Sequence, residues 1–455
     1  EEESQFKDFL IEEVIMKYKK AFIYILSFLI ALFLVGQIGT YIYVEAPLKT
    51  DFYGSIAREE VRQLQALHKV KCVSGSDWIH VGWIAGPDTE KYIIEIKDDK
   101  GTWKQIGTSQ FGSFLYRGNG GLFKVIKVNK QTQQQSTLGY AKAFSTGINV
   151  TVYKPIIAGN YRPLYKPEKH GYYINDHTIF QDAKRNWRLI GITSKTDGDP
   201  NAETYFAVAK SENFPHIMMA EDESVADVGD LAWAPHVIKH NNVYHMFWSP
   251  HKLHHMISRD GIHWENHAVL MKAPYHKFFR DCMILQVASD QWLLYTTARG
   301  LFFSQVDVYQ SFDLVHWQYI RTALRSSFGS ERNSPFASME SPFVVKYNDG
   351  YYLSLTYNND TLFIHGVLLL FKVWLDKESY NDTLVFYSNN PYDFGVYRGK
   401  NRSDSLIATL RAHAPEWVYV PSTKAWYITT CGWKWVATLT NGEVAIAPVM
   451  WHKVK

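Results

Sequence analysis

The sequence predicts an all-β protein that is preceded by a single apolar helix. Three observations support this prediction. A unit of two strands joined by a tight turn recurs along residues 160–455, aromatic residues make up 15% of the chain, and one largely apolar run without any charge occupies residues 21–44. Aromatic side chains favour strands, and a recurring unit of short strands is typical of a sheet built by repetition.

The N-terminal part carries the pattern of a membrane anchor. Residues 1–20 are polar and end in several lysines, whereas residues 21–44 carry no charge. About 20 apolar residues cross a bilayer, and lysines before the span favour a cytoplasmic N-terminus. We therefore expect a cytoplasmic segment at 1–20, a transmembrane helix at 21–44 in the lipid bilayer and a stalk at 45–59. The remainder would be extracytoplasmic, meaning lumenal, periplasmic or extracellular. A cleaved secretory signal is the alternative.

A small β-sandwich is expected over residues 60–147. Apolar and polar residues alternate with period two in three stretches, 78–83, 91–96 and 121–129. This period indicates antiparallel strands with one buried face. The segment resembles a fibronectin type III domain in Trp83, in its Lys-Tyr-Ile-Ile-Glu-Ile strand and in Gly101-Thr102-Trp103. The resemblance implies a spacer or a module that binds protein partners.

The remaining residues, 160–455, repeat one pattern of strand, turn and aromatic-rich strand. The repeats begin near Asn175-Asp176, Trp233-Ala234-Pro235, Arg280-Asp281, Glu340-Ser341-Pro342 and His413-Ala414-Pro415. A second element recurs as Ser258–Trp264 and Ser311–Trp317. Repeats of this length with four strands each predict a five-bladed β-propeller. A jelly roll or paired sandwich is the alternative, but neither requires the second repeated element.

Composition argues against several classes of function. The formal net charge is +3 for 455 residues, so no strongly basic field suggests a nucleic-acid partner. The three cysteines, Cys72, Cys282 and Cys431, are too far apart for a zinc pattern or a disulfide framework. We expect no cofactor, with a structural calcium or other ion in the propeller channel as the one conceivable exception.

Three acidic residues stand where the innermost strands of different blades would begin. These are Asp176, Asp281 and Glu340. Innermost strands converge on the propeller axis, so we expect the three carboxylates at equivalent positions around one funnel. A single Asp at a strand end is usually a turn cap, but three together favour catalysis. Glycoside hydrolysis requires a pair of carboxyl groups, one acid and one base or nucleophile.

The same residues resemble the five-bladed glycoside hydrolases of families 43, 62, 32, 68 and 117. Trp233-Ala234-Pro235-His236 is similar to a blade of the family 43 arabinanases and xylosidases, and Glu340-Ser341-Pro342 to their general-acid blade. This match implies that Asp176 is a general base, that Asp281 orients the sugar and modulates a pKa, and that Glu340 is the general acid. The substrate-binding residues that we expect are Trp233, His236, Arg280 and His413.

A second resemblance implies a different mechanism. Asn175-Asp176 and Arg280-Asp281 are similar to motifs of the fructosidases in families 32 and 68, where the first Asp is a nucleophile. That match implies retention of configuration, whereas the family 43 match implies inversion. Proline normally follows both Asp residues in these motifs, but this chain has His177 and Cys282 there.

Two functional hypotheses remain. One is a membrane-anchored hydrolase of extracytoplasmic glycans, and the other is a catalytically silent propeller that binds glycans or serves as an accessory subunit of a membrane assembly. Four Asn-x-Ser/Thr triplets suit a glycosylated, extracytoplasmic chain; they begin at Asn149, Asn359, Asn381 and Asn401.

Overall fold

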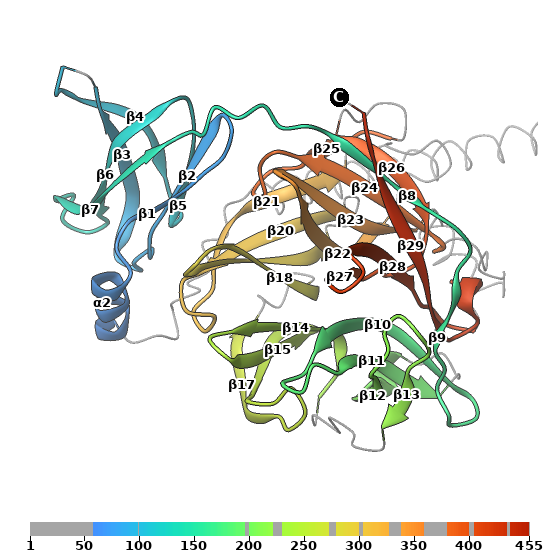
Figure 1. Cartoon of the computed structure of the whole chain (residues 1–455). Helices are drawn as coiled ribbons and strands as arrows, with labels where there is room; N and C mark the ends of the chain where they lie inside the picture. Colours follow the sequence, from blue (N-terminus) through green and yellow to red (C-terminus); the bar gives the residue numbers. More distant parts are fainter. Residues whose placement is uncertain are drawn as a thin grey trace, which may run out of the picture. The chain divides into compact units, whose positions relative to one another are not determined.

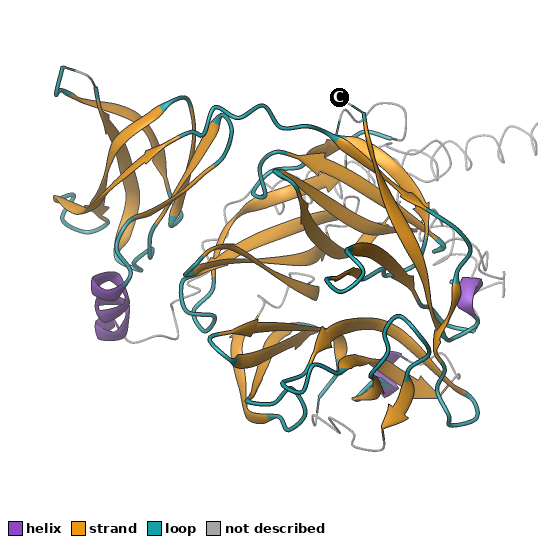
Figure 2. Cartoon of the chain, viewed as in Figure 1, coloured by secondary structure: helices purple, strands orange, loops and turns teal. Residues whose placement is uncertain are grey.

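Strands dominate the described part of the chain (Figure 2). The computed structural model describes residues 58–98, 100–195, 200–221, 230–272, 279–299, 304–326, 338–358, 380–399, 405–434 and 437–454. The expected cytoplasmic segment, the transmembrane helix at 21–44 and most of the stalk lie outside these residues. Within these ranges, no helix combines the length and the apolar character needed to span a bilayer.

A helix and two sheets form the first part of the described chain. The helix α2 (Arg58–Leu67) was not expected, because the sequence predicted a stalk that leads directly into strands. One sheet has the order β1-β2-β5, and the other has the order β4-β3-β6-β7. Their bounds are β1 (Lys71–Ser74), β2 (Trp78–Gly82), β3 (Thr89–Lys97), β4 (Trp103–Ser109), β5 (Ser113–Arg117), β6 (Gly120–Asn129) and β7 (Gln135–Phe144).

The two sheets enclose one apolar core, which makes this unit a β-sandwich. Val81 and Trp83 approach from one side, and Tyr92, Ile94 and Phe123 from the other; all are buried. Successive side chains of a strand point to opposite faces, so each sheet keeps a second, outer face. The assignment of this sandwich to the fibronectin type III family stays a prediction.

Five further sheets follow in chain order (Figure 1). The first is β10 (Tyr172–Gln181), β11 (Trp187–Lys195), β12 (Tyr205–Ser211) and β13 (Met219–Glu221), and the second is β14 (Trp233–His240), β15 (Val243–Ser249), β16 (Lys252–Ser258) and β17 (Glu265–Lys272). The third is β18 (Arg280–Ala288), β19 (Gln291–Arg299), β20 (Ser304–Ser311), β21 (Gln318–Ser326) and β25 (Gly395–Tyr397). The fourth is β22 (Ser338–Tyr347), β23 (Gly350–Asn358), β24 (Asp382–Ser388) and β26 (Leu406–Arg411). The fifth is β27 (Trp417–Val420), β28 (Ala425–Thr430), β29 (Val444–Lys453) and β8 (Tyr153–Ile157), with β9 (Arg162–Tyr165) also pairing with β29.

Apolar clusters join these five sheets into a ring. One cluster packs the first sheet on the second, and others pack the second on the third, the third on the fourth, and the fourth on the fifth. A further cluster packs the fifth sheet on the first, through Val418 and Val444 against Ile174 and Leu189. Because each sheet is packed between two neighbours and the last returns to the first, the fold is a five-bladed β-propeller. A jelly roll or paired sandwich would not produce this ring.

The ring is closed by strands from its two ends. β8 precedes the first blade in sequence, yet it pairs with β29 of the fifth blade from Tyr153↔Lys453 to Ile157↔Val449. An isolated bridge between Ile174 and Gly432 also joins the first blade to the fifth. The propeller therefore begins at β8, earlier than the predicted start at residue 160.

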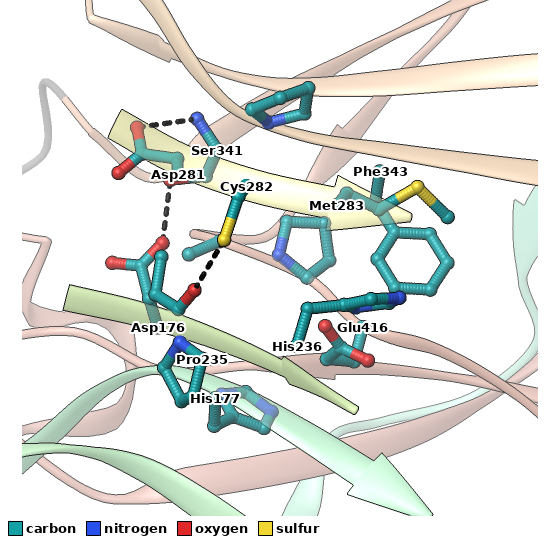
Figure 3. A pocket seen from close by; sticks show the side chains of 14 residues that line it. Asp176, His177, Pro235, His236, Asp281, Cys282, Met283, Ser341, Phe343 and Glu416 are labelled. Carbon is teal, nitrogen blue, oxygen red and sulfur yellow. Dashed lines mark hydrogen bonds between the residues drawn. The ribbon is translucent and has the colours of Figure 1, made fainter. Parts of the chain in front are cut away.

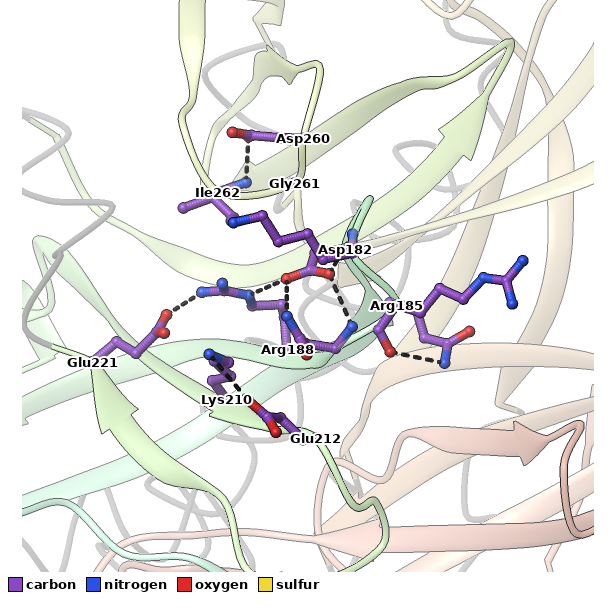
Figure 4. Close-up of polar contacts among 12 residues, drawn as sticks. Asp182, Arg185, Arg188, Lys210, Glu212, Glu221, Asp260, Gly261 and Ile262 are labelled. Atoms are coloured by element: carbon purple, nitrogen blue, oxygen red, sulfur yellow. Dashed lines mark hydrogen bonds and ion pairs between the residues drawn. The ribbon is translucent and has the colours of Figure 1, made fainter.

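The repeated Ser-x-Asp element forms the same turn in two blades. Ser258 Oγ donates to Asp260 Oδ1 over 3.0 Å, and Ser311 Oγ donates to Asp313 Oδ1 over 3.1 Å. In both turns the second Asp oxygen bonds a histidine ring, that of His263 or His316, at 2.7 Å. The first of these turns packs beside the ion pair of Asp182 with the buried Arg188, and the Asp260 carbonyl accepts the Ala183 N–H over 2.9 Å (Figure 4). The turn therefore also links one blade to the next.

The sandwich contacts the propeller through its three-stranded sheet. The Trp78 indole donates to the Asn389 carbonyl over 2.8 Å, and His80 stacks on Tyr392 with ring centroids 3.9 Å apart. The Gln310 amide donates to the Gly112 carbonyl over 2.7 Å. Burial lowers the pKa of His80 to about 3, so this stacked histidine stays neutral at physiological pH.

Candidate active site

A bulge interrupts the innermost strand of every blade at the same place. The pairing slips between Ile174 and His177, Trp233 and His236, Arg280 and Met283, and Glu340 and Phe343. In the fifth blade, hydrogen bonds at 413–416 follow the same pattern. Each bulge places two residues of the inner strand opposite one residue of its neighbour.

The first bulge residue has left-handed backbone in four of the blades. The φ angles are 46° at Ala234, 54° at Asp281, 53° at Ser341 and 41° at Ala414. This region is unfavourable for residues with a Cβ atom and persists only where the surrounding structure imposes it. The bulge thus holds a set of inner-strand side chains in a conformation that a regular strand would not give.

The bulge alters the expected arrangement of the three acids. Glu340 directly precedes its bulge, Asp281 is the first residue of its bulge, and Asp176 is the second. The expectation that the three acids occupy equivalent positions is therefore wrong. They occupy three successive positions relative to the bulge, one in each of three blades.

Ser341 connects two of the acids directly. Its hydroxyl donates to Asp176 Oδ1 over 2.6 Å, and its N–H donates to Asp281 Oδ2 over 3.2 Å (Figure 3). The same N–H also lies 3.1 Å from Thr297 Oγ1. Since Ser341 follows Glu340 in the chain, one bulge positions all three carboxylates.

Arg280 supplies the positive charge of this group. Its guanidinium forms an ion pair with Glu340, and its Nε lies 3.5 Å from Asp281 Oδ2. Both acids are buried, with 4% of Glu340 and 5% of Asp281 exposed. A buried carboxylate requires such a partner, because burial strongly penalises the isolated charge.

Burial sets the protonation of the two aspartates. It raises the pKa of Asp176, although the Ser341 hydroxyl and Arg280 oppose that effect. It also raises the pKa of Asp281, where Arg280 opposes the effect and the Asp176 charge adds to it. Both shifts favour the protonated form of these aspartates more than exposure to water would.

A series of hydroxyl groups fixes the bulges of neighbouring blades. Ser249 Oγ accepts the Asp281 N–H over 2.9 Å, and Thr356 Oγ1 accepts the Ala414 N–H over 2.7 Å. Thr297 occupies the corresponding place beside Ser341. Each hydroxyl belongs to the blade before the bulge that it contacts, so the positions of the acids depend on correct blade packing.

Most of the expected substrate-binding residues stand, like Glu340, directly before the bulge of their own strand. Trp233, Arg280 and His413 each directly precede a bulge. His413 is fully buried, and its Nε2 lies 3.1 Å from Asn175 Oδ1, beside Asp176. Burial lowers the pKa of His413 to about 4, so the ring is neutral and orients Asn175.

His236 is placed differently. It follows its bulge, its Nε2 lies 3.2 Å from the Ile284 carbonyl, and its ring packs edge-on against Phe343. It lines the same pocket as the aspartates but lies near Glu416, at the other end from Asp281 (Figure 3). Burial lowers its pKa to about 4. His236 lines this pocket, whereas Trp233 and Arg280 do not belong to its lining.

Two buried acids near this site were missed in the sequence. Glu203 accepts a hydrogen bond from the Tyr173 hydroxyl, and burial raises its pKa to about 7, with the Asp176 charge contributing. Glu416 lines the pocket, and burial raises its pKa well above the usual value. Glu203 belongs to no repeated motif, but Glu416 follows Ala414-Pro415 as His236 follows Ala234-Pro235 and could have been found by that alignment.

The structure describes two of the four candidate glycosylation sites. Asn149 is exposed, whereas Asn381 is fully buried and accepts the Leu439 N–H over 3.4 Å, so the folded chain leaves no room for a glycan at Asn381. Asn359 and Asn401 lie outside the described residues. Within the described ranges, no group of three or more His, Cys, Asp or Glu side chains is arranged to hold a metal ion.

Comparisons with known proteins find similarity only among solved structures. No protein-family profile matches the chain, and no curated protein matches it. A thermostable family-43 glycoside hydrolase aligns at 15% identity and TM-score 0.46, over 64% of this chain and 93% of the other. An α-L-arabinofuranosidase from Fusarium graminearum, solved with an iminosugar inhibitor, aligns at 12% identity and TM-score 0.41, over 66% and 97%. A family 32 β-fructofuranosidase from Bombyx mori, solved with sucrose, aligns at 14% identity and TM-score 0.41, over 66% and 64%.

Proposed function

We propose that this protein is a glycoside hydrolase that acts on extracytoplasmic glycans, of the arabinofuranosidase/xylosidase or fructosidase type. The observation that carries the proposal is the Ser341 bridge between Asp176 and Asp281, directly beside the ion pair of Glu340 and Arg280. Few arrangements other than a catalytic centre would gather three acids from three blades around one cation at a propeller axis. Hydrolysis of a glycosidic bond uses such a set of carboxyl groups.

Each acid has a role that fits its surroundings. Glu340 protonates the glycosidic oxygen, Asp176 activates water or attacks the anomeric carbon, and Asp281 orients the sugar. The Ser341 hydroxyl stabilises the ionised form of Asp176, which a base or nucleophile needs.

Arg280 is the residue that links binding to catalysis in this proposal. Without a sugar, its guanidinium stabilises the carboxylate form of Glu340, which cannot donate a proton. Substrate hydroxyls would take over the guanidinium and free Glu340 to be protonated. Trp233 offers a second contact, since its buried indole N–H has no partner among the described residues.

Hydrolysis of a panel of aryl glycosides tests the proposal. The panel comprises α-L-arabinofuranosides, β-D-xylosides and fructosides, with the wild-type protein, Glu340→Gln and Asp176→Asn. We expect each substitution to lower kcat by about 10³-fold, because general acid or base catalysis contributes about 10²–10⁴-fold. Asp349→Asn, at an exposed hairpin turn, is the matched control and should leave kcat unchanged. Wild-type rates in the Glu340→Gln protein, with normal urea unfolding, would refute the assignment.

The stereochemistry of the product decides between the two mechanistic schemes. A proton NMR time course records the first anomer that is released. Inversion would make Asp176 a general base, whereas retention would make it a nucleophile.

The second candidate is a catalytically silent propeller that binds glycans or serves a membrane assembly. The ion pair of Glu340 with Arg280, together with His177 and Cys282 in place of proline, favours it. This candidate predicts that oligosaccharides bind by calorimetry without turnover, and that Glu340→Gln leaves the affinity unchanged.

We also propose that residues 21–44 anchor the protein and that the propeller lies outside the cytoplasm. The support is the uncharged run in the sequence, the lysines before it and the exposed sequon at Asn149. Resistance to alkaline carbonate extraction tests the anchor. A mobility shift after glycosidase treatment, lost in Asn149→Gln, tests the location.

A further inference from the structure

The outer face of the sheet β4-β3-β6-β7 carries two aromatic rings that lie close to each other. Trp103 belongs to β4 and Tyr140 to β7, at the two edges of this sheet. Edge strands three spacings apart are separated by about 14 Å. The ring centroids are nevertheless 5.8 Å apart, with planes at 43°. Both side chains must therefore lean over the central strands toward each other.

Lysines surround these rings on the same face. The Lys124 Nζ lies 4.6 Å from the centre of the Trp103 ring, and the Lys97 Nζ lies 5.9 Å from it. The Lys142 Nζ lies 5.6 Å from the centre of the Phe144 ring. Ammonium groups at these distances are attracted by the ring electrons.

The strand register confirms that these residues share one face. Lys97 pairs with Leu122, and Leu122 with Lys142, whereas Lys124 pairs with Tyr140. Residues two apart on a strand point the same way, and the alternate residues Tyr92 and Ile94 are buried in the sandwich core.

This face is open to solvent. Tyr140 is 54% exposed and Phe144 is 55% exposed, which is high for rings of this size. The hydrogen bonds of Trp78 and the stacking of His80 on the propeller come from β2 of the other sheet. Lys97, Lys124 and Lys142 bring positive charge to this face, and Lys124 is ion-paired there with Glu95.

We propose that this face, defined by Trp103, Tyr140, Phe144, Lys97, Lys124 and Lys142, binds a chain of acidic sugars that carry carboxylate or sulfate groups. The exposed rings of Tyr140 and Phe144 offer an apolar surface to the apolar face of a sugar. The ammonium groups of Lys97 and Lys142, beside the rings of Trp103 and Phe144, match anions spaced along such a chain. An acidic polysaccharide offers both features in one extended ligand, whereas an acidic peptide or a lipid headgroup offers the charge without a row of flat rings. The inference does not depend on the proposed catalytic activity.

Affinity measurements on the full-length protein in detergent test this inference. The probes are a sulfated heparin-type oligosaccharide, an oligogalacturonate and a neutral arabinan oligosaccharide of similar length, measured by calorimetry at two salt concentrations. We expect at least one acidic probe to bind, with an affinity that falls with salt. Substitutions on this face should not change the affinity for the neutral probe, even if that probe binds at the propeller.

Two sets of variants separate the rings from the charges. Trp103→Ala with Tyr140→Ala should weaken binding of the acidic probe at least tenfold. Lys97→Glu with Lys142→Glu should weaken it similarly and reduce its salt dependence. The matched control is Lys346→Glu, which removes an exposed lysine 5.8 Å from the Tyr351 ring on the propeller and should leave the affinity unchanged.

Several outcomes would overturn the inference. These are an absence of binding to either acidic probe, wild-type affinity for the acidic probe in both sets of variants, or binding to vesicles with anionic lipids but not to the oligosaccharides. Unfolding curves confirm that the variants are folded, and the double lysine variant remains informative if the Trp103 substitution destabilises the sandwich.

Discussion

Glu203 is a buried acid whose charge is coupled to residues of the candidate site. It lies next to Tyr173, three residues before Asp176, and interacts electrostatically with Asp176 and Arg280. Its pKa is raised to about 7, chiefly by burial, so it changes charge near physiological pH. Ionisation of Glu203 would raise the pKa of Asp176 and so change the acid–base balance of the site.

Replacement of Glu203 with Gln should change how stability depends on pH. The folded pKa, about 7, lies above the unfolded value of about 4.3, so burial of the protonated acid contributes fully below about pH 4. This contribution is lost as the pH rises through 7. We expect the wild type to lose roughly 2–3 kcal/mol of unfolding free energy between pH 4.5 and 8, and Glu203→Gln to lose much less. Urea unfolding across this range measures the difference; parallel curves for the two proteins would contradict it.

Ser341 shows the limit of reasoning from motifs at this scale. Its place in Glu-Ser-Pro suggested only a neighbour of the acid. The structure gives it hydrogen bonds to two aspartates from two other blades, at 2.6 and 3.2 Å. Contacts between blades join residues far apart in the chain, so no local pattern could specify them.

At the scale of the element, the bulge is the feature on which the site depends. Slipping the register by one residue moves every later side chain of a strand to its other face. The bulge performs this shift within each inner strand, so Glu340 can precede it while Asp176 and Asp281 lie inside it. In regular strands, acids at successive register positions of the three blades would point alternately to opposite faces.

The left-handed residues of the bulge offer a direct test of this strain. Ala234→Gly should raise the unfolding free energy by about 0.5–1 kcal/mol, because glycine adopts positive φ without steric cost. Ala232→Gly is the matched control, since Ala232 is fully buried and has ordinary backbone; it should lower stability by about 1 kcal/mol. Chemical denaturation measures both, and destabilisation of equal size by the two substitutions would argue against strain at Ala234.

The Ser-x-Asp turn makes a prediction in acid. Burial alone would raise the pKa of Asp313, but hydrogen bonds from the His316 ring and from two backbone N–H groups lower it to about 2. Its folded pKa lies below the unfolded value of about 3.9, so its contribution is present above pH 4 and is lost as the pH falls toward 2.

Asp313→Asn should therefore flatten the acid limb of the stability curve. We expect the fall in unfolding free energy between pH 5 and 2 to shrink by about 2 kcal/mol at most. Asp349→Asn at the exposed hairpin turn is the control and should leave the limb unchanged. If the unfolding free energy of Asp313→Asn falls as steeply between pH 5 and 2 as that of the wild type, the Asp313 hydrogen bonds do not stabilise the folded state in this pH range.

At the scale of the whole molecule, the propeller depends on closure by β8. This strand comes from the N-terminal side of the ring and pairs with β29 near the end of the chain. The ring therefore cannot close until both ends of the propeller have been made. Long-range pairing of this kind slows folding, because a large loop must close before the contact is gained.

Ile156→Pro tests the contribution of closure. In this antiparallel pair, the Ala158 N–H donates to the Pro448 carbonyl and the Val454 N–H donates to the Val152 carbonyl. Hydrogen-bonded pairs recur at every second residue, so Ile156, which lies opposite Met450, also belongs to a hydrogen-bonded pair. A proline there removes a donor and should cost about 3 kcal/mol of unfolding free energy. Ile156→Ala keeps the N–H of a residue that is 38% exposed, and should cost less than about 1 kcal/mol. Equal stability of the two variants would mean that β8 contributes little to closure.

The sequence by itself determined the all-β class and the five-fold repeat. It did so because period-two alternation, tight turns and recurring motifs are local properties of the chain. It also identified Asp176, Asp281, Glu340 and Arg280 as candidate site residues, since the charge of each side chain follows from its residue type alone. Only the tertiary structure decided the position of each acid relative to its bulge, the entry of β8 into the ring, and the proximity of Glu203 to Asp176. Those features depend on strand register and on blade-to-blade packing, which are set by contacts between residues far apart in the chain.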